Sequence, residues 1–225
     1  MPTASGLEAA LDARVREAAP GGVRFVARDG GPPALDYGGA SKGLALDRAA
    51  SVLDADASVL GALVTAGSTT IAIGSKPGGD TWRIGVEDPR EPGSIVAVFE
   101  RASGPLVVST SGDYQKYFET EGVRYHHILD PSTGAPARGL RSLTIASTSH
   151  SALQADILST ALFVDGLTGA LEEATARGLS VYLVDDEGSV HTEDGPAGSG
   201  ISLDRLAEPV SRSEAYSPMY CLTRS

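Results

Sequence analysis

Apolar residues along this chain recur with two different spacings, which predict two kinds of element. A spacing of three or four residues, typical of a helix with one buried face, occurs in four segments. Leu7, Leu11 and Val15 mark the first of them, and Gly178 is placed to end the last. The helices predicted in this way cover residues 7–18, 40–55, 149–164 and 167–177.

Short apolar runs predict strands between these helices. Most lie in the middle of the chain, separated by turns of Gly, Pro and Asp, which is typical of antiparallel connections. The predicted strands cover residues 23–27, 62–66, 70–73, 82–86, 95–99, 106–109, 143–146 and 181–184. A strand-rich middle with a few packed helices predicts an α+β fold with mixed, largely antiparallel sheets. We expect one domain over residues 1–195 and an irregular, weakly patterned C-terminal tail over residues 196–225.

Composition narrows the function classes. The 225 residues are enough for one sizeable core, and the net charge of −11 argues against binding to nucleic acid or to an anionic membrane. A single cysteine, Cys221, excludes an intramolecular disulfide and a cysteine-based zinc cluster. No stretch reaches the length of a membrane span and no leader pattern opens the chain, so a cytoplasmic location is expected.

The turn before the second predicted helix has the make-up of an anion site. Residues 36–43 read Asp-Tyr-Gly-Gly-Ala-Ser-Lys-Gly and lead from an apolar strand end into a helix. Free main-chain N–H groups and the positive end of the helix dipole would point at one place, beside Lys42. The stretch is neither a Walker loop nor a dinucleotide fingerprint. An ordinary glycine-rich turn before a surface helix is therefore the alternative.

A second candidate site lies on the third predicted helix. Asp156 and Thr160 share one helix face, and Ser159 borders it. The surroundings are apolar, so the carboxylate must be paired, hydrogen-bonded or bound to a metal. Oxygen ligands of these kinds suit Mg²⁺ better than a soft metal. Alternatively, Asp156 caps a neighbouring element and the Thr160 hydroxyl bonds back to the Asp156 carbonyl.

Two more segments carry polar groups that could meet a nucleotide. The adjacent His126 and His127 are expected on opposite faces of a strand, one towards a pocket and one outward. Residues 109–114 place a run of hydroxyls, Ser111 among them, before a glycine, where they could bind a phosphate or a ribose. An edge strand that ends in a turn explains this run equally well. Asp130 opens a turn sequence with a structural explanation of its own.

Six ordered blocks of the chain together resemble the ApbE-like FAD:protein FMN transferase family. They lie between about residues 33 and 190 and include both candidate sites. The blocks are Asp-Tyr-Gly-Gly-Ala-Ser-Lys-Gly (36–43) with Asp-Arg-Ala-Ala (47–50), Val-Thr-Ala-Gly (64–67), Trp-Arg-Ile-Gly-Val-Glu-Asp-Pro-Arg (82–90), Ser-Thr-Ser-Gly-Asp-Tyr (109–114), Tyr-His-His-Ile-Leu-Asp-Pro-Ser-Thr-Gly (125–134) and Ala-Asp-Ile-Leu-Ser-Thr-Ala-Leu (155–162).

The resemblance implies a T-fold-like enzyme that uses Mg²⁺ and FAD, transfers FMN to a threonine of an acceptor protein and releases AMP. Some members instead hydrolyse FAD to FMN and AMP. His127, Asp156 or a metal-bound water would accept the proton of the incoming hydroxyl. By position, Asp36, Lys42, Ser111, His127 and Leu129 would contact FAD, and the Gly39 carbonyl, Asp156, Ser159 and Thr160 would hold Mg²⁺.

Two departures from the family pattern leave three functions open. Members usually carry about a hundred more N-terminal residues, which help to enclose the flavin. The family's Asn-Ala-Gly-Gly-Asp block reads Thr-Ala-Gly-Ser-Thr here, over Thr65–Thr69. The functions are an FMN transferase, an FAD pyrophosphatase or specialised biosynthetic enzyme, and a noncatalytic flavin-binding or partner subunit. Expected partners are FAD, an acceptor flavoprotein, a chain that supplies the N-terminal wall, or a second copy in a homodimer.

Overall fold

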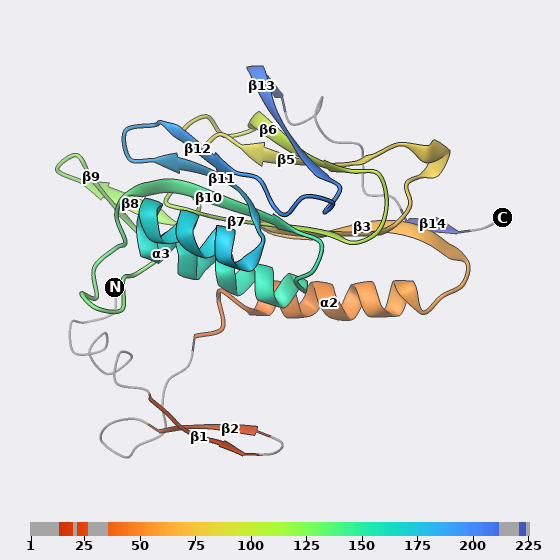
Figure 1. Ribbon diagram of the computed structural model, residues 1–225. Coiled ribbons are helices and arrows are strands. Elements are labelled where there is room, and N and C mark those ends of the chain that lie inside the picture. Colours follow the sequence, from red (N-terminus) through yellow and green to blue (C-terminus); the bar gives the residue numbers. More distant parts are fainter. Residues whose placement is uncertain (1–13, 20–21, 27–35, 212–220, 224–225) are drawn as a thin grey trace.

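The computed structural model describes residues 14–19, 22–26, 36–211 and 221–223. A seven-stranded sheet forms the middle of three layers, with two helices on one face and a smaller sheet on the other (Figure 1). All its strand pairs are antiparallel, which confirms the predicted α+β class. In spatial order its strands are β12 (Val190–Glu193), β11 (Ser180–Asp185), β10 (Leu140–Ser147), β7 (Leu106–Gly112), β4 (Thr69–Gly74), β3 (Val59–Ala66) and β14 (Cys221–Thr223).

Two helices, α2 (Ser41–Asp54) and α3 (Ala152–Arg177), cover one face of the large sheet. In α2 the buried positions are Gly43, Leu46 and Ala50, so the helical spacing in the sequence marks the face that packs. Most of α3 is apolar, and its buried side chains meet those of β7, β10 and β11 in the first core cluster. These two helices contribute the polar residues of the candidate site.

The other face is covered by a three-stranded sheet of β13 (Ile201–Ser211), β6 (Ser94–Arg101) and β5 (Trp82–Glu87). Trp82, Ile84 and Val86 alternate along β5 and point into the second core cluster. Because side chains of β7 also alternate, Val107 joins the helix-side cluster and Val108 joins the opposite one. This alternation puts Ser109 and Ser111 on the face that α3 covers.

Two hairpins complete the described chain. β1 (Arg14–Ala19) pairs with β2 (Gly22–Val26), and β8 (Tyr117–Thr120) pairs with β9 (Val123–His126). The β8–β9 hairpin turns at Glu121–Gly122 and projects at one end of the main sheet (Figure 1). A 3-10 turn, η1 (Pro77–Gly79), lies between β4 and β5.

Three sequence predictions need correction. The first predicted helix is wrong over residues 14–18, which belong to strand β1, and its remaining residues lie outside the described ranges. The tail from residue 196 is not irregular over Ile201–Ser211, where β13 pairs with β6, or over Cys221–Thr223, where β14 pairs with β3. β13 has no buried position, so it leaves little hydrophobic pattern in the sequence.

The two last predicted helices form one element with a break. Gly166 has a φ of 73°, outside helical values, and separates the two halves of α3. The helix begins at Ala152, later than the predicted residue 149, with Ser151 as its N-cap. In this capping box the Ser151 hydroxyl accepts from the Gln154 N–H, and the Gln154 side chain accepts from the Ser151 N–H. Gly178 ends the helix in the left-handed conformation, as predicted.

The N-terminal ends of α2 and α3 lie in main-chain contact. A Cβ at Gly43 would lie 2.2 Å from the Ala152 carbonyl oxygen and 2.6 Å from the Leu153 Cα. One turn along α2, the Asp47 carboxylate accepts hydrogen bonds from the main-chain N–H groups of Ala152 (2.7 Å) and Leu153 (3.0 Å). A side chain of one helix thus caps the other, and glycine allows the approach.

We expect Gly43→Ala to destabilise the protein, although alanine is the better helix former. Helix propensity alone favours Ala by about 1 kcal/mol, whereas a methyl forced between two main chains costs about 1–3 kcal/mol or more. Urea unfolding followed by circular dichroism measures the difference. An increase in the unfolding free energy would show that the helices can separate without cost.

Candidate functional site

Asp156 lies at the centre of the candidate site, with 2% of its surface exposed. Its Oδ2 accepts a hydrogen bond from the Gly43 N–H in the first turn of α2 (3.0 Å). Its Oδ1 accepts one from the Thr69 hydroxyl at the start of β4 (3.2 Å). Both bonds satisfy a buried carboxylate, as physical chemistry requires. The sequence alternative that Asp156 caps a neighbouring element is therefore confirmed, because its carboxylate caps the first turn of α2.

Lys42 supplies the charge partner of Asp156. Its Nζ lies 2.8 Å from Oδ1 of Asp156 and also donates to the main-chain oxygen of Gly38 (3.1 Å). About a third of the lysine side chain is exposed, so it borders solvent while the carboxylate does not. The structure therefore brings together the two candidate sites that the sequence places more than a hundred residues apart.

A chain of hydroxyl groups continues from Asp156 beneath α3. Thr69 bonds Ser109 (2.9 Å), and Ser159 lies 3.1 Å from both Ser109 and Ser111. Ser111 also lies 3.2 Å from the Thr160 hydroxyl. Because a hydroxyl can both donate and accept, this chain satisfies every member without an added charge. Ser159 is buried within it, which makes Ser159 a support for the site rather than a group open to a ligand.

Gly39 and Thr160 face each other across the opening of the site. A Cβ at Gly39 would lie 3.3 Å from Oγ1 of Thr160, so only glycine leaves that oxygen clear. The Thr160 hydroxyl donates to the Asp156 carbonyl (3.2 Å), as the sequence alternative proposed, and keeps lone pairs for another partner. Carboxylate, hydroxyl and carbonyl oxygens thus gather at one place.

This donor set fits a hard cation shared with a substrate. Among the described residues no cluster of three or more His, Cys, Asp and Glu side chains is arranged to hold a metal. Mg²⁺ is commonly bound through one or two carboxylates together with substrate phosphates. The Lys42 ammonium, seated between a carboxylate and a carbonyl oxygen, already occupies this region as a cation.

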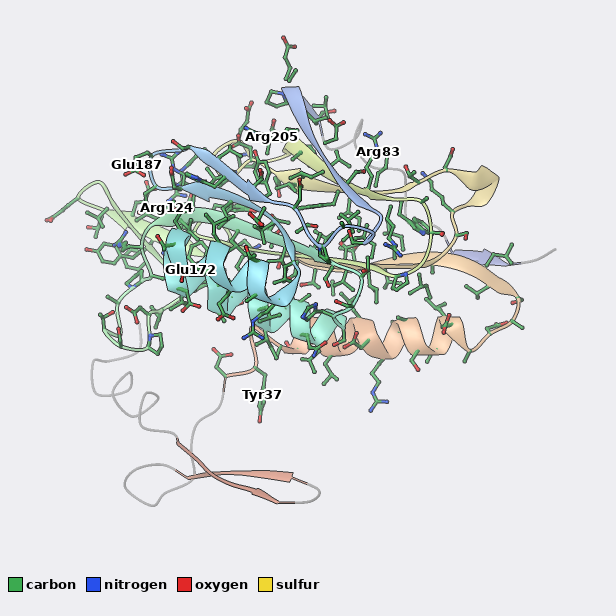
Figure 2. All side chains as sticks on the ribbon, in the orientation of Figure 1. Tyr37, Arg83, Arg124, Glu172, Glu187 and Arg205 are labelled. Carbon is green, nitrogen blue, oxygen red and sulfur yellow. The ribbon has the colours of Figure 1, made fainter. Side chains whose placement is uncertain are left out.

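Asp36 lies on the rim of the site. Its Oδ1 accepts a hydrogen bond from the Gly38 N–H (2.7 Å), which shapes the turn before α2. The next residue, Tyr37, is 62% exposed and projects away from both helices (Figure 2). Asp36 also borders two hollows, one on each side of the site. The smaller one, about 470 Å³, is lined mainly by α3 side chains such as Ile157, Ala161 and Val164.

The larger hollow, about 570 Å³, has an aromatic wall. His127 and Leu129 line it together with Lys116 and Pro136. The wall comes from the β8–β9 hairpin, where Phe118 and Tyr125 stack with ring centres 5.1 Å apart. A cavity of this size with stacked rings and a lysine suits a planar, anionic ligand. The remaining lining residues are Asp36, Tyr117, Phe118, Tyr125, His126 and Gly134.

The two adjacent histidines differ in burial but both line the larger hollow, whereas the sequence predicted one ring towards a pocket and the other outward. His126 is buried, packs edge-on against Phe163 and bonds the Ala137 carbonyl through Nε2 (2.8 Å). His127 is exposed on the cavity side. Partial burial lowers the pKa of both, because it disfavours the charged imidazolium, and the charges of Lys116 and Lys42 lower that of His127 further. His127 is therefore neutral at pH 7 and able to accept a proton.

Ion pairs fasten the aromatic wall to the sheet. Arg90 donates two hydrogen bonds of 2.7 Å to the Asp113 carboxylate, and the Arg124 guanidinium of β9 lies 3.4 Å from the same carboxylate. The Arg124 guanidinium also lies over the Tyr117 ring, 4.0 Å from its centre. The bidentate bond to Asp113 raises the pKa of Arg90, although partial burial opposes this shift. In the hairpin Arg124 pairs with Glu119 near the turn, and Figure 2 labels it at the end of the molecule where the hairpin projects.

Sequence reasoning missed three residues that hold the site together. Asp47, Thr69 and Ser109 contact partners far along the chain, and nothing in the local pattern names those partners. Asp47 lies in one of the blocks that carry the family resemblance, and this was the sequence signal that could have identified it. Thr69 stands where the family block has a carboxylate, and the structure shows it serving Asp156 as a neutral donor.

No helix within the described ranges is both long and apolar enough to cross a membrane.

Comparisons with known proteins agree with this fold and these motifs. Curated relatives include an FAD:protein FMN transferase of Rhodobacter capsulatus, 38% identical over 69% of this chain and 29% of the relative. Another, of Vibrio cholerae, is 37% identical over 52% of this chain and 33% of the relative. The chain thus spans about a third of the length of these two relatives.

Solved structures give the same result. The ApbE protein from Thermotoga maritima is 37% identical, with a TM-score of 0.69 over 86% of this chain and 62% of that one. The apo flavinyl transferase ApbE of Pseudomonas stutzeri is 30% identical, with a TM-score of 0.61 over 91% and 59%. The ApbE family itself matches residues 1–183. The chain therefore belongs to the ApbE family.

Proposed function

We propose that this chain carries the catalytic site of a Mg²⁺-dependent FAD:protein FMN transferase. The observation that carries the proposal is the buried Asp156 carboxylate, which pairs with Lys42 and lies one helical turn from Thr160, a residue that lines the smaller hollow. The names of the relatives support the reaction, and the oxygen donor set supports the metal. The acceptor would be a threonine of another protein.

Most of the site residues would bind the dinucleotide and the metal, and His127 would accept a proton. Asp156, Thr160 and the Gly39 carbonyl would hold Mg²⁺, with Ser159 behind them. When bound, the metal would neutralise charge on the pyrophosphate and on the phosphoryl group in transit. Lys42 and Asp36 would orient the phosphates and ribose, and the buried Ser111 would support Thr160 through their hydroxyl contact. The aromatic hollow near Leu129 would take a planar ring of FAD.

In the proposed reaction the threonine oxygen attacks the phosphorus on the FMN side of the pyrophosphate. A new P–O bond forms to threonine, and the bond to the AMP phosphate breaks, so AMP leaves with the bridging oxygen. The proton of the threonine hydroxyl passes to His127, whose ring is neutral at pH 7. His127 lines the same hollow as Asp36, and this shared hollow supports its assignment as the base.

We expect the purified protein, given Mg²⁺ and FAD, to release AMP, and Asp156→Asn to reduce the rate by about 100-fold or more. Chromatography measures AMP, and in-gel fluorescence of a threonine-bearing acceptor measures attached FMN. Asp54→Asn, an equal change on an exposed residue at the far end of α2, is the control and should keep the wild-type rate.

The two readouts separate the alternatives. AMP without attached flavin would contradict the transferase and leave an FAD pyrophosphatase. No AMP with any acceptor would contradict both enzymes and favour a binding subunit, whose activity would appear only with a second chain.

We expect the transfer rate to be constant at neutral pH and to fall below pH 6.5, the usual pKa of histidine, since the His127 pKa lies lower than that value. Protonation removes the lone pair that accepts the proton. His127→Gln should lower the rate and abolish this acid limb, while His150→Gln, another histidine with a pKa lowered by burial, should keep it. An unchanged limb in His127→Gln would rule out His127 as the base.

A further inference from the structure

The Asp156 carboxylate has three hydrogen-bond donors, and they differ in how easily they can leave. The Gly43 N–H is part of the main chain of α2, and the Thr69 hydroxyl is buried at the start of a central strand. The Lys42 ammonium sits on a flexible side chain that is about one-third exposed. Of these three donors, Lys42 is therefore the one that can leave without moving a helix or the sheet.

The Lys42 ammonium bridges the two sides of the site. It lies 2.8 Å from the Asp156 carboxylate of α3 and 3.1 Å from the Gly38 carbonyl, next to the Gly39 carbonyl that would hold the metal. A cation between a carboxylate and a main-chain carbonyl has the surroundings that a metal ion requires. The lysine is thus a stand-in for the metal.

The path of the lysine side chain is shaped by the turn between β3 and β4. Gly67 has a φ of 60°, and a Cβ there would lie 3.3 Å from the Lys42 Cδ. Glycine is favoured by this backbone conformation, and it also leaves the lysine stem room. The lysine side chain therefore passes Gly67 without a clash, and its ammonium reaches the oxygens of both Asp156 and Gly38.

Charge then links the metal to the dinucleotide. The carboxylate and the ammonium neutralise each other in the structure, so a divalent cation added alone would face the positive charge of Lys42 at close range. A pyrophosphate adds two negative charges, which restore neutrality and give the displaced ammonium an anion to bind. Metal and pyrophosphate should therefore bind far better together than either does alone.

We propose that Lys42 is the resident counter-cation of Asp156 and that it moves to the pyrophosphate when the metal binds, which couples the two ligands. The proposal rests on the proposed function only for the identity of the ligands. It makes Lys42 a positioning residue that opposes metal binding without nucleotide and favours it with nucleotide. A lysine that only contacts phosphate would show the second effect and not the first.

The test measures Mn²⁺ binding by electron paramagnetic resonance, with no turnover. Lys42→Met, similar in length and uncharged, should bind Mn²⁺ about tenfold more tightly than wild type without nucleotide, a typical size for such coupling. With saturating ADP, which carries a pyrophosphate, wild type should gain about tenfold or more and Lys42→Met much less. Equal Mn²⁺ affinities without nucleotide would overturn the proposal.

Two control variants separate this effect from general electrostatics. The chain has three lysines, and Lys76→Met removes the same charge beside η1, so it should bind Mn²⁺ like wild type. Adding Asp156→Asn to Lys42→Met should abolish the tight binding. If Lys76→Met tightens binding equally, or the double variant still binds tightly, the proposal fails.

A measurement on the unmodified protein covers the case in which Lys42→Met does not fold. With ¹⁵N-labelled lysine, the Lys42 ammonium signal should shift on addition of Mg²⁺ and ADP together, while that of Lys76 stays in place. An unmoved Lys42 signal would overturn the proposal. Failure of AMP release would instead contradict the proposed function, and neither binding readout depends on it.

Discussion

Two carboxylates that reach across one helix contact hold this structure together. Asp47 of α2 caps the first turn of α3, and Asp156 of α3 accepts a hydrogen bond from the first turn of α2. The exchange is possible because Gly43 lets the two main chains touch. Each helix therefore satisfies free N–H groups of the other. The site lies where it does because Asp156 must stay in this contact to remain paired while buried.

Much of the fold could be predicted because its elements obey simple local patterns. The spacing of apolar residues in α2 and their alternation in β5 identify the face of each element that packs. In both elements that face is buried. Asp156 stood out because a carboxylate in an apolar helix needs a partner. The partners themselves could not be predicted, since Gly43 lies 113 residues and Thr69 lies 87 residues from it in sequence.

The failures have the same physical origin. β13 pairs with β6 across about a hundred residues and buries no side chain fully, so its local sequence carries no burial pattern. The segment Arg14–Ala19 combines spacing suited to a helix with pairing to β2 as a strand. In both places tertiary pairing overrides local preference. Thr69 replaces the carboxylate of a family block, and the sequence shows that replacement. It could not predict that the Thr69 hydroxyl donates a hydrogen bond to Asp156.

The aromatic wall of the larger hollow has a different relation to the scaffold. The strands β8 and β9 pair only with each other among the described strands, and ion pairs of Arg124 and Asp113 attach the hairpin to the rest. The surroundings of Asp156 are instead built from helices and central strands that share the core. Substitutions in the hairpin can therefore change the aromatic wall without touching a residue that contacts Asp156. In this architecture the shape of the larger hollow and the hydrogen bonding of the buried carboxylate can vary independently of each other.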